Sequence, residues 1–211
     1  MPSADRTAPG PRTRLTAGQR RESILEAAAG VFAGAGYRAA KMSDVAARVG
    51  VTEPVIFQNF GSKAALFAAV LERVTAGIQA ELDARGGDHG SAGDLLAHIL
   101  GAGQGPERHG AHGAHGKHRG ILADAASLIA DPAAGEAATG AARVIAGHLA
   151  DLLRRGQAGG DIRPELDPEP AAWLLLSVLA TRSLRAAAAR PAGVEAGVAD
   201  LTLRTLRAGP A

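Results

Sequence analysis

The amino-acid sequence predicts an all-α protein. Apolar residues recur at helical spacing along most of the 211 residues, and no segment has the alternating pattern of a half-buried strand. Helix-start and helix-stop signals separate these periodic segments. The expected helices cover residues 17–34, 42–49, 53–60, 63–85, 94–100, 121–130, 133–157, 171–190 and 194–206.

The chain opens with a segment that has no apolar period. Residues 1–15 are rich in Pro, Gly and Arg, which predicts a disordered basic arm. It is either a non-specific tail or an arm that enters a minor groove. Thr16 and Gln19 form a capping-box pattern, so the first helix is expected to begin directly after Thr16. Gly34 and Gly36 are expected to end it.

The most informative segment is 41–63, which reads as two short helices, a tight turn and the start of a third helix. Ala46 is small where two helices must cross closely, and Gly50 stands where the turn requires a positive φ. Thr52 is expected to cap the next helix, and Pro54 fits its first turn. This pattern predicts a helix-turn-helix, a motif that places its second helix in the DNA major groove. Its expected buried side is Val45, Val49, Val51, Ile56 and Phe60.

The residues from Arg20 to Glu72 resemble the N-terminal domain of TetR-family transcriptional regulators. The resemblance implies a helix-turn-helix head over residues 16–78, with the motif at 41–60, and a helical effector-binding and dimerisation domain over 79–211. The features that match are Ile24-Leu25, Ala27-Ala28, Phe32, Gly36-Tyr37, Asp44-Val45-Ala46, Gly50-Val51, Ile56-Phe57, Phe60, Lys63 and Leu66-Phe67.

The second helix of the motif contains no Lys or Arg between Thr52 and Phe60. Base reading is therefore expected from polar and apolar side chains: Gln suits adenine, Glu can accept from cytosine, and Val or Pro can contact a thymine methyl. A Glu in the first turn can equally interact only with the helix dipole. The candidate base-reading residues are Glu53, Pro54, Val55 and Gln58.

The resemblance also implies a set of phosphate contacts around the motif. Two departures from the family pattern matter: Lys41 replaces a hydroxyl cap, so Ser43 or Asp44 would have to assist that helix end, and Phe57 replaces a tyrosine. Phe57 has no hydroxyl for a phosphate and is interpreted as a packing residue. The implied phosphate-binding residues are Lys41, Ser43, Thr52, Asn59 and Lys63.

The distribution of charge supports a DNA-binding head, although an ordinary solvated surface would also account for it. Residues 1–73 carry ten Lys and Arg against six Asp and Glu, a net charge of +4. The remaining residues carry thirteen against fifteen, a net charge of −2. The basic excess therefore lies on the segment with the motif.

The remaining chain is expected to form a homodimer on double-stranded DNA, because one head buries too little DNA for tight binding. Helices near 133–157 and 168–190 have wide apolar faces and resemble the pair that joins subunits in the family. The resemblance further implies a small-molecule effector that releases a repressor from its operator. Trp173 is the only aromatic residue outside the head, so a largely aliphatic effector is expected. Trp173 and His148 are weak effector-binding candidates; each also suits core packing.

Four histidines recur at every third residue in a glycine-rich segment. Such a cluster can bind Zn, Ni or Cu, which would make the protein a metal-responsive regulator. The glycines and the tandem repeat equally fit a low-complexity loop, and no metal is expected as the main interpretation. The candidate ligands are His109, His112, His115 and His118.

Other classes of protein find little support in the sequence. There is no cysteine, and no nucleophile elbow, phosphate-binding glycine loop or zinc-protease helix, so neither an enzyme nor a cofactor is expected. An architectural DNA-binding protein without an effector stays an alternative. The apolar runs are too short to span a bilayer, and a bacterial cytoplasmic location is expected.

Overall fold

The computed structural model describes residues 16–88, 91–101, 121–122, 124–188 and 193–208. Within these ranges the regular structure is helical, as predicted, and the only β-type pairing is an isolated bridge between Ile162 and Arg207. Residues 121–122 and 124–127 are also helical. The helices are α1 (Ala17–Ala39), α2 (Met42–Val49), α3 (Glu53–Phe60), α4 (Lys63–Asp88), α5 (Ala92–Leu100), α7 (Gly135–Ala158), α8 (Pro168–Ala180), α9 (Arg182–Ala188) and α10 (Val194–Leu206).

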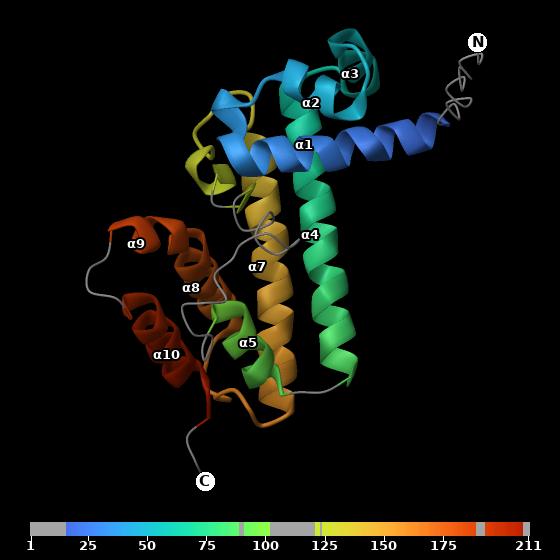
Figure 1. The fold of residues 1–211 in the computed structure, drawn as a ribbon. Helices are drawn as coiled ribbons and strands as arrows, with labels where there is room; N and C mark the ends of the chain where they lie inside the picture. The colour runs from blue at the N-terminus through green and yellow to red at the C-terminus, as the bar shows by residue number, and fades with distance from the viewer. Residues whose placement is uncertain (1–15, 89–90, 102–120, 123, 189–192, 209–211) are drawn as a thin grey trace, which may run out of the picture.

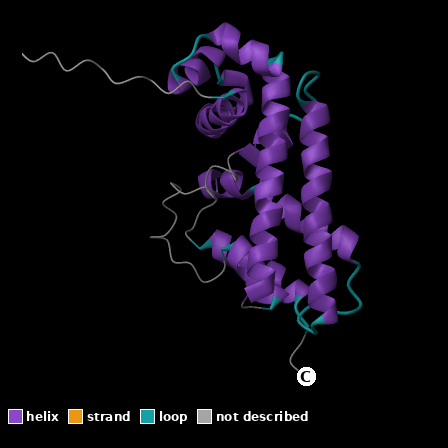
Figure 2. Cartoon of the chain, turned by 90° about the vertical axis from the view of Figure 1, so that its right-hand side faces the viewer, coloured by secondary structure: helices purple, strands orange, loops and turns teal. Residues whose placement is uncertain are grey.

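The helices form a head and an elongated body. Figure 1 shows α1, α2 and α3 gathered at one end of the molecule, with α4 and α7 running side by side away from them. Figure 2, turned by a quarter, shows the same two long helices next to each other. Helices α8, α9 and α10 lie together on one flank of the body. The head is therefore carried at the end of a two-helix column.

Local signals set several helix ends at the predicted residues. Thr16 accepts a hydrogen bond from the Gln19 amide and the Gln19 side chain accepts one from Thr16, which completes the predicted capping box. Ser62 accepts from the Ala65 amide at 3.0 Å and so caps α4. The motif helices α2 and α3 and the last helix, α10, have the predicted bounds.

Other predicted ends are wrong. Helix α1 continues through Gly34, because a single glycine costs a helix only about 1 kcal/mol; the interruption comes at Gly36, where φ is 74° and ψ is 163°. Helix α4 continues through Gly86 to Asp88, so the predicted break at 86–93 is much shorter. The helical residues 124–127 are followed by a turn at 128–130, so the helix predicted to end at 130 ends at residue 127.

The predicted helix at 171–190 is two helices. Asp167 accepts from the Glu169 amide and begins α8 at Pro168, three residues earlier than expected. The helix ends at Ala180, Thr181 is its C-cap, and α9 follows directly. Two carbonyl groups near this end have partners, because Thr181 Oγ1 donates to the Ser177 oxygen and Arg185 donates to the Val178 oxygen, each at 2.7 Å.

Two hydrophobic clusters form the core. One lies in the head and extends into the body, since Ile121, Leu128 and Ala134 are fully buried against residues of α1, α2 and α4. The other joins α5, α7, α8 and α10 in the body. On α7 the apolar residues Ile145, Leu149, Leu152 and Leu153 are buried, whereas Val144 is 45% exposed.

The segment between α7 and α8 is held by several hydrogen bonds. The Gln157 amide donates to the backbone oxygens of Arg163 and Leu166 at 2.9 and 2.7 Å. Asp161 accepts from the Ala92 amide at 3.0 Å. These bonds fix the far end of the body, where α5 and the end of α10 meet this segment.

No single helix among the described residues is long and apolar enough to cross a membrane. Helix α3 and the segment Lys63–Ala84, which meet at a bend, together have the length and apolar composition of a membrane span, and these are the only criteria that the pair meets.

Two glycines of α7 allow a matched test of this packing. A Cβ on Gly156 would meet Ile162 and, at 2.8 Å, the Ala92 side chain, whereas one on Gly147 would meet nothing within 4 Å. We expect Gly156→Ala to lower the free energy of unfolding by about 1–3 kcal/mol through overpacking. Gly147→Ala should leave it unchanged or raise it by up to about 1 kcal/mol. Denaturant unfolding at one protein concentration measures both; equal effects would contradict the tight packing at Gly156.

Candidate nucleic-acid interface

The segment 42–60 folds as the predicted helix-turn-helix. Gly50 has φ 76° and ψ 35°, the left-handed conformation that the turn was predicted to require. Its amide and that of Val51 bond to the Ala46 oxygen, at 2.9 and 3.0 Å, and so close the end of α2. Ala46 is buried at the crossing of the two helices, and Ile56 anchors α3 in the core.

The outer side of α3 presents the side chains predicted to read bases. Glu53, Pro54 and Gln58 are exposed, and Val55 is half-buried at the edge of this surface. Phe57 is 40% exposed, so its interpretation as a packing residue is wrong. It lies one turn after Glu53 on a short helix whose inner side is already filled by Ile56 and Phe60.

Neither Lys41 nor Thr52, the residues at the starts of α2 and α3, caps its helix with its side chain. Thr52 occupies the N-cap position of α3, but its hydroxyl makes no cap hydrogen bond, contrary to prediction. A cap would accept from the second or third helical amide; Pro54 has none, and the Val55 amide bonds to the Thr52 backbone oxygen at 3.0 Å. Lys41 at the start of α2 also makes no cap bond. Lys41, Ser43 and the Thr52 residue are exposed.

Asn59 is turned toward its own helix. Its side-chain amide donates to the Val55 oxygen at 2.7 Å, and the residue is half-buried. This bond uses one of the two N–H groups of the amide that the resemblance assigned to a phosphate. The backbone oxygen of Asn59 accepts from Arg21 at 2.9 Å.

Arg21 is a residue of this site that the sequence did not identify. Its guanidinium lies 4.1 Å from the centre of the Phe60 ring as well as bonding to Asn59. A cation at a helix C-terminus is favoured by the helix dipole, so Arg21 holds the last turn of α3 against α1. The sequence gives no signal for this pairing, because the two residues are 38 positions apart.

Lys63 begins α4 beside the recognition helix. Its ammonium donates to the Arg38 oxygen at 3.2 Å and lies 4.9 Å from the centre of the Tyr37 ring. A lysine ammonium has three donors, so these contacts fix the group while leaving it able to meet a phosphate. Lys63 is half-buried.

The weak effector candidates do not come together in a cavity. Trp173 is 45% exposed on α8, and His148 is half-buried on α7, where its Nδ1 has no hydrogen-bond partner among the described residues. The predicted metal-binding histidines lie at 109–118, outside the described residues, and the described part of the chain contains no group of three potential ligands.

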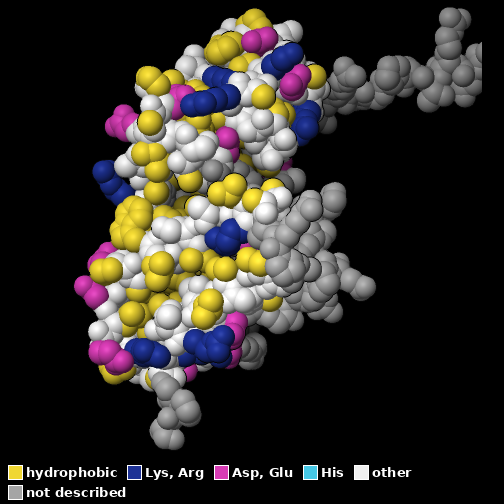
Figure 3. All heavy atoms as spheres, turned by 90° about the vertical axis from the view of Figure 1, so that its left-hand side faces the viewer, with side chains coloured by type: hydrophobic (Ala, Val, Ile, Leu, Met, Phe, Trp, Pro, Cys, Tyr) yellow, Lys and Arg dark blue, Asp and Glu magenta, His cyan; other side chains and the backbone are white. Residues whose placement is uncertain are grey.

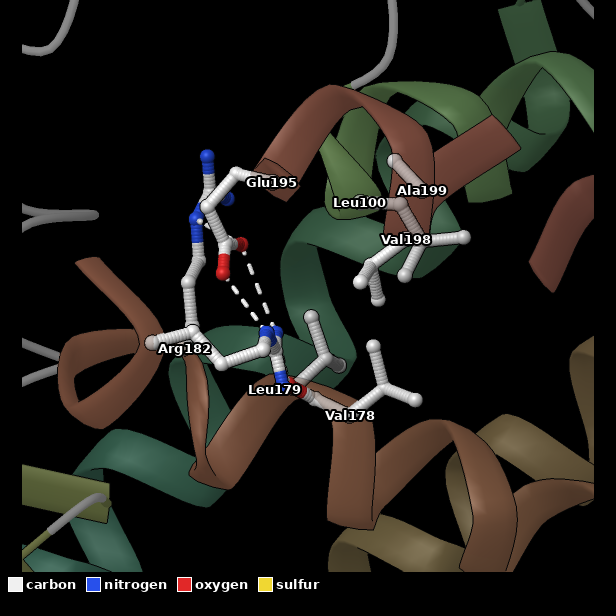
Figure 4. Close-up of a pocket in the computed structure, with 8 residues that line it drawn as sticks. Leu100, Val178, Leu179, Arg182, Glu195, Val198 and Ala199 are labelled. Atoms are coloured by element: carbon white, nitrogen blue, oxygen red, sulfur yellow. Dashed lines mark hydrogen bonds and ion pairs between the residues drawn. The ribbon is translucent and has the colours of Figure 1, made fainter. Parts of the chain in front are cut away.

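A small cavity lies between α5, α8, α9 and α10 (Figure 4). On one side of the cavity, the Glu195 carboxylate forms ion pairs with the Arg185 Nε at 2.6 Å and the Arg182 Nε at 3.6 Å. The free volume of the cavity is about 10 Å³, which is room for a single water molecule. Its other lining residues are Leu100, Val178, Leu179, Val198 and Ala199.

The helix-turn-helix and its flanks match a known family. Residues 24–70 match the model of bacterial regulatory proteins of the TetR family. Residues 24–70 therefore form a DNA-binding segment of the TetR type. The members of this family are DNA-binding regulators rather than enzymes, which agrees with the sequence prediction.

Three relatives illustrate how far the similarity extends. A 60-residue segment is 48% identical to the HTH-type transcriptional activator FasR of Mycolicibacterium smegmatis, which covers 28% of this chain and 27% of FasR. Escherichia coli NemR in its reduced form is 20% identical with a TM-score of 0.72, over 91% of this chain and 98% of NemR. The ketosteroid transcriptional regulator KstR2 of Mycobacterium tuberculosis is 20% identical with a TM-score of 0.54, over 94% of this chain and all of KstR2. These two structures share the fold of this chain.

We expect Arg21→Met to loosen the TetR-type head, because it removes a charge-assisted bond and the contact with Phe60. The loss in unfolding free energy should be about 1–2 kcal/mol. Arg143→Met is a matched control, since Arg143 is exposed on α7 and makes no hydrogen bond or ion pair with another described side chain. Denaturant unfolding followed by circular dichroism measures both; equal losses would show that Arg21 has no special role.

Proposed function

We propose that the protein is a homodimeric transcriptional repressor that binds a palindromic DNA operator and is released by a small-molecule effector. The observation that carries this proposal is the exposed side of α3 in a helix-turn-helix of the TetR family. Lys41 and Lys63 lie at the starts of the neighbouring helices, where they can neutralise phosphates on either side of the groove.

Sequence reading is assigned to the exposed side of α3. The Gln58 side-chain amide can form two hydrogen bonds with an adenine, and the Glu53 carboxylate can accept one from the amino group of cytosine. Pro54, Val55 and the exposed part of Phe57 supply apolar contacts for thymine methyl groups. Because α3 has no Lys or Arg, specificity rests on these polar and apolar contacts rather than on arginine bound to guanine.

Support for a dimer comes from apolar side chains left exposed on the flank formed by α8, α9 and α10. Figure 3 looks onto this flank and shows hydrophobic side chains gathered across it. A second subunit would remove this surface from water. Among the described large apolar side chains, α7 exposes only Val144. We therefore place the interface on α8 to α10 rather than on α7 and α8. The exposed residues of the flank are Trp173, Leu174, Leu184 and Leu201.

The effector part of the proposal rests on the family and on the body of the chain. A ketosteroid regulator shares the fold, which supports a small apolar molecule as the effector class. The cavity beside Glu195 is far smaller than a ligand site of about 300 Å³, so an effector bound at this place would require the surrounding helices to separate. An effector that weakens DNA binding must itself be bound more weakly on DNA.

Selection of bound sequences from random duplex DNA tests the proposal. We expect a palindrome whose half-sites lie about one helical turn apart. A reporter gene placed behind the selected sequence should be silenced by the protein; activation, as in the name of FasR, would reverse the proposed sign of regulation. Enrichment of no sequence, or protection of DNA without sequence preference, would contradict the regulator and favour an architectural protein.

Two substitutions separate base reading from phosphate binding. Gln58→Ala should cost about 1–3 kcal/mol on the selected operator and relax the preference at one position of each half-site. Lys63→Ala should weaken binding to all sequences alike and reduce the salt slope by about one for each head. Affinity titrations at several salt concentrations measure both. Loss of specificity with Lys63→Ala, or a uniform loss with Gln58→Ala, would reverse the two roles.

The dimer surface has its own test. Leu201→Asp places a charge on the apolar flank and should shift the protein toward monomer, with a loss of operator affinity, because a charge must then be buried. Ile129→Asp is the control: Ile129 is 53% exposed but lies in the turn after residue 127. Sedimentation equilibrium gives the association constant. A dimer unaffected by Leu201→Asp would exclude α10 from the interface.

A further inference from the structure

The turn at the end of α1 is shared by the head and the body. Gly36 has φ 74° and ψ 163°, a conformation that is essentially restricted to glycine. A Cβ at this position would also lie 3.2 Å from an oxygen of Asp124. The chain therefore passes directly against a carboxylate of the body at this point.

Asp124 holds the turn by a short bond. Its Oδ2 accepts from the Tyr37 amide at 2.6 Å in a partly buried position. The helical segment that carries Asp124 is itself anchored in the head, because Ile121 and Leu128 are fully buried in the same core as Tyr37. A carboxylate bonded to a backbone amide makes a charge-assisted hydrogen bond, which is stronger than a neutral one.

Asp131 makes a second, weaker contact with the turn. Its Oδ2 lies 3.8 Å from Arg38, whose side chain is 75% exposed, and exposed pairs of this kind contribute little. Its other oxygen accepts from the Ala133 and Ala134 amides at the start of α7. Burial and then the charge of Asp131 raise the pKa of Tyr37, so the ring stays neutral.

The opposite side of the turn holds Lys63. The Arg38 oxygen accepts from its ammonium, and the neutral Tyr37 ring lies beneath it. Tyr37 is fixed by Phe32 and Phe67, whose ring centres lie 6.2 and 4.9 Å from its own. Both groups that position the ammonium thus belong to the two residues that follow Gly36.

We propose that Asp124 is a positioning residue for operator binding: it holds the turn 36–38 in the conformation that presents Lys63 to a DNA phosphate. Movement of the body segment around Asp124 would then change the DNA contact without moving α3. This inference rests on the proposed function, because it needs an operator on which Lys63 acts.

The sign of the effect separates positioning from simple electrostatics. A carboxylate acting only by charge would repel phosphate, so its removal would strengthen DNA binding. Positioning predicts the opposite for Asp124→Ala: a loss of affinity of about fivefold to tenfold, the equivalent of one charge-assisted contact. Asp124→Asn keeps an acceptor oxygen for the Tyr37 amide and should retain at least most of the wild-type affinity.

The experiment combines these variants with Lys63→Ala in a double-mutant cycle. The full-length protein is titrated against its selected operator at several salt concentrations. We expect Asp124→Ala to reduce the salt slope by about one for each head, as Lys63→Ala does. We expect the double variant to bind no more weakly than Lys63→Ala alone. Asp151→Ala is the matched control, since that carboxylate pairs only with Arg154 on the outside of α7 among the described contacts.

Each outcome decides one part. Wild-type affinity or tighter binding for Asp124→Ala, an unchanged salt slope, or losses that simply add with Lys63→Ala would overturn the positioning role while leaving the regulator intact. Failure of the wild-type protein to bind any selected sequence would overturn the proposed function and this inference with it. If Asp124→Ala does not fold, Asp124→Ser replaces it in the same cycle, because its shorter side chain keeps a polar group but cannot reach the Tyr37 amide.

Discussion

The head of this protein depends on residues of the body to complete its hydrophobic core. Ile121 and Leu128 have no exposed surface, and they pack in one cluster with Phe32 and Phe67. Truncating either side chain would open a cavity in this core, at a cost of several kcal/mol. Closely packed interiors transmit displacement rather than absorb it. A shift in the segment around residues 121–134 therefore reaches the helix-turn-helix through packing alone.

The composition of α3 places a second constraint on the molecule. A recognition helix without Lys or Arg obtains little of the electrostatic attraction that dominates DNA affinity. In the proposed function this deficit falls on the neighbouring cations Lys41 and Lys63, at the starts of α2 and α4. These groups are few in one subunit. We therefore expect the pairing of two heads in the proposed dimer to contribute a larger share of the binding than in a head with a basic recognition helix.

Sequence signals that act within one turn of helix were sufficient for much of the fold. Thr16 with Gln19, Ser62 before α4 and Gly50 after α2 each set a helix end at the predicted residue. The same holds for the outward position of Gln58 in α3, which follows from the burial of Ile56 and Phe60 by helical periodicity. In each case the interacting groups are at most four residues apart, so the local sequence contains both partners.

The predictions that failed depend on partners far away in the chain. The apolar run 171–190 reads as one helix, yet it breaks where Arg185 turns back to the Val178 oxygen while also bonding Glu195 on α10. A rule based on local sequence does not distinguish Gly34 from Gly36 as the end of α1. Only Gly36 lies against Asp124, which is 88 residues later in the chain. Partners such as Glu195 and Asp124 are brought to these positions by the tertiary fold, so their effect on a helix end cannot be inferred from local spacing.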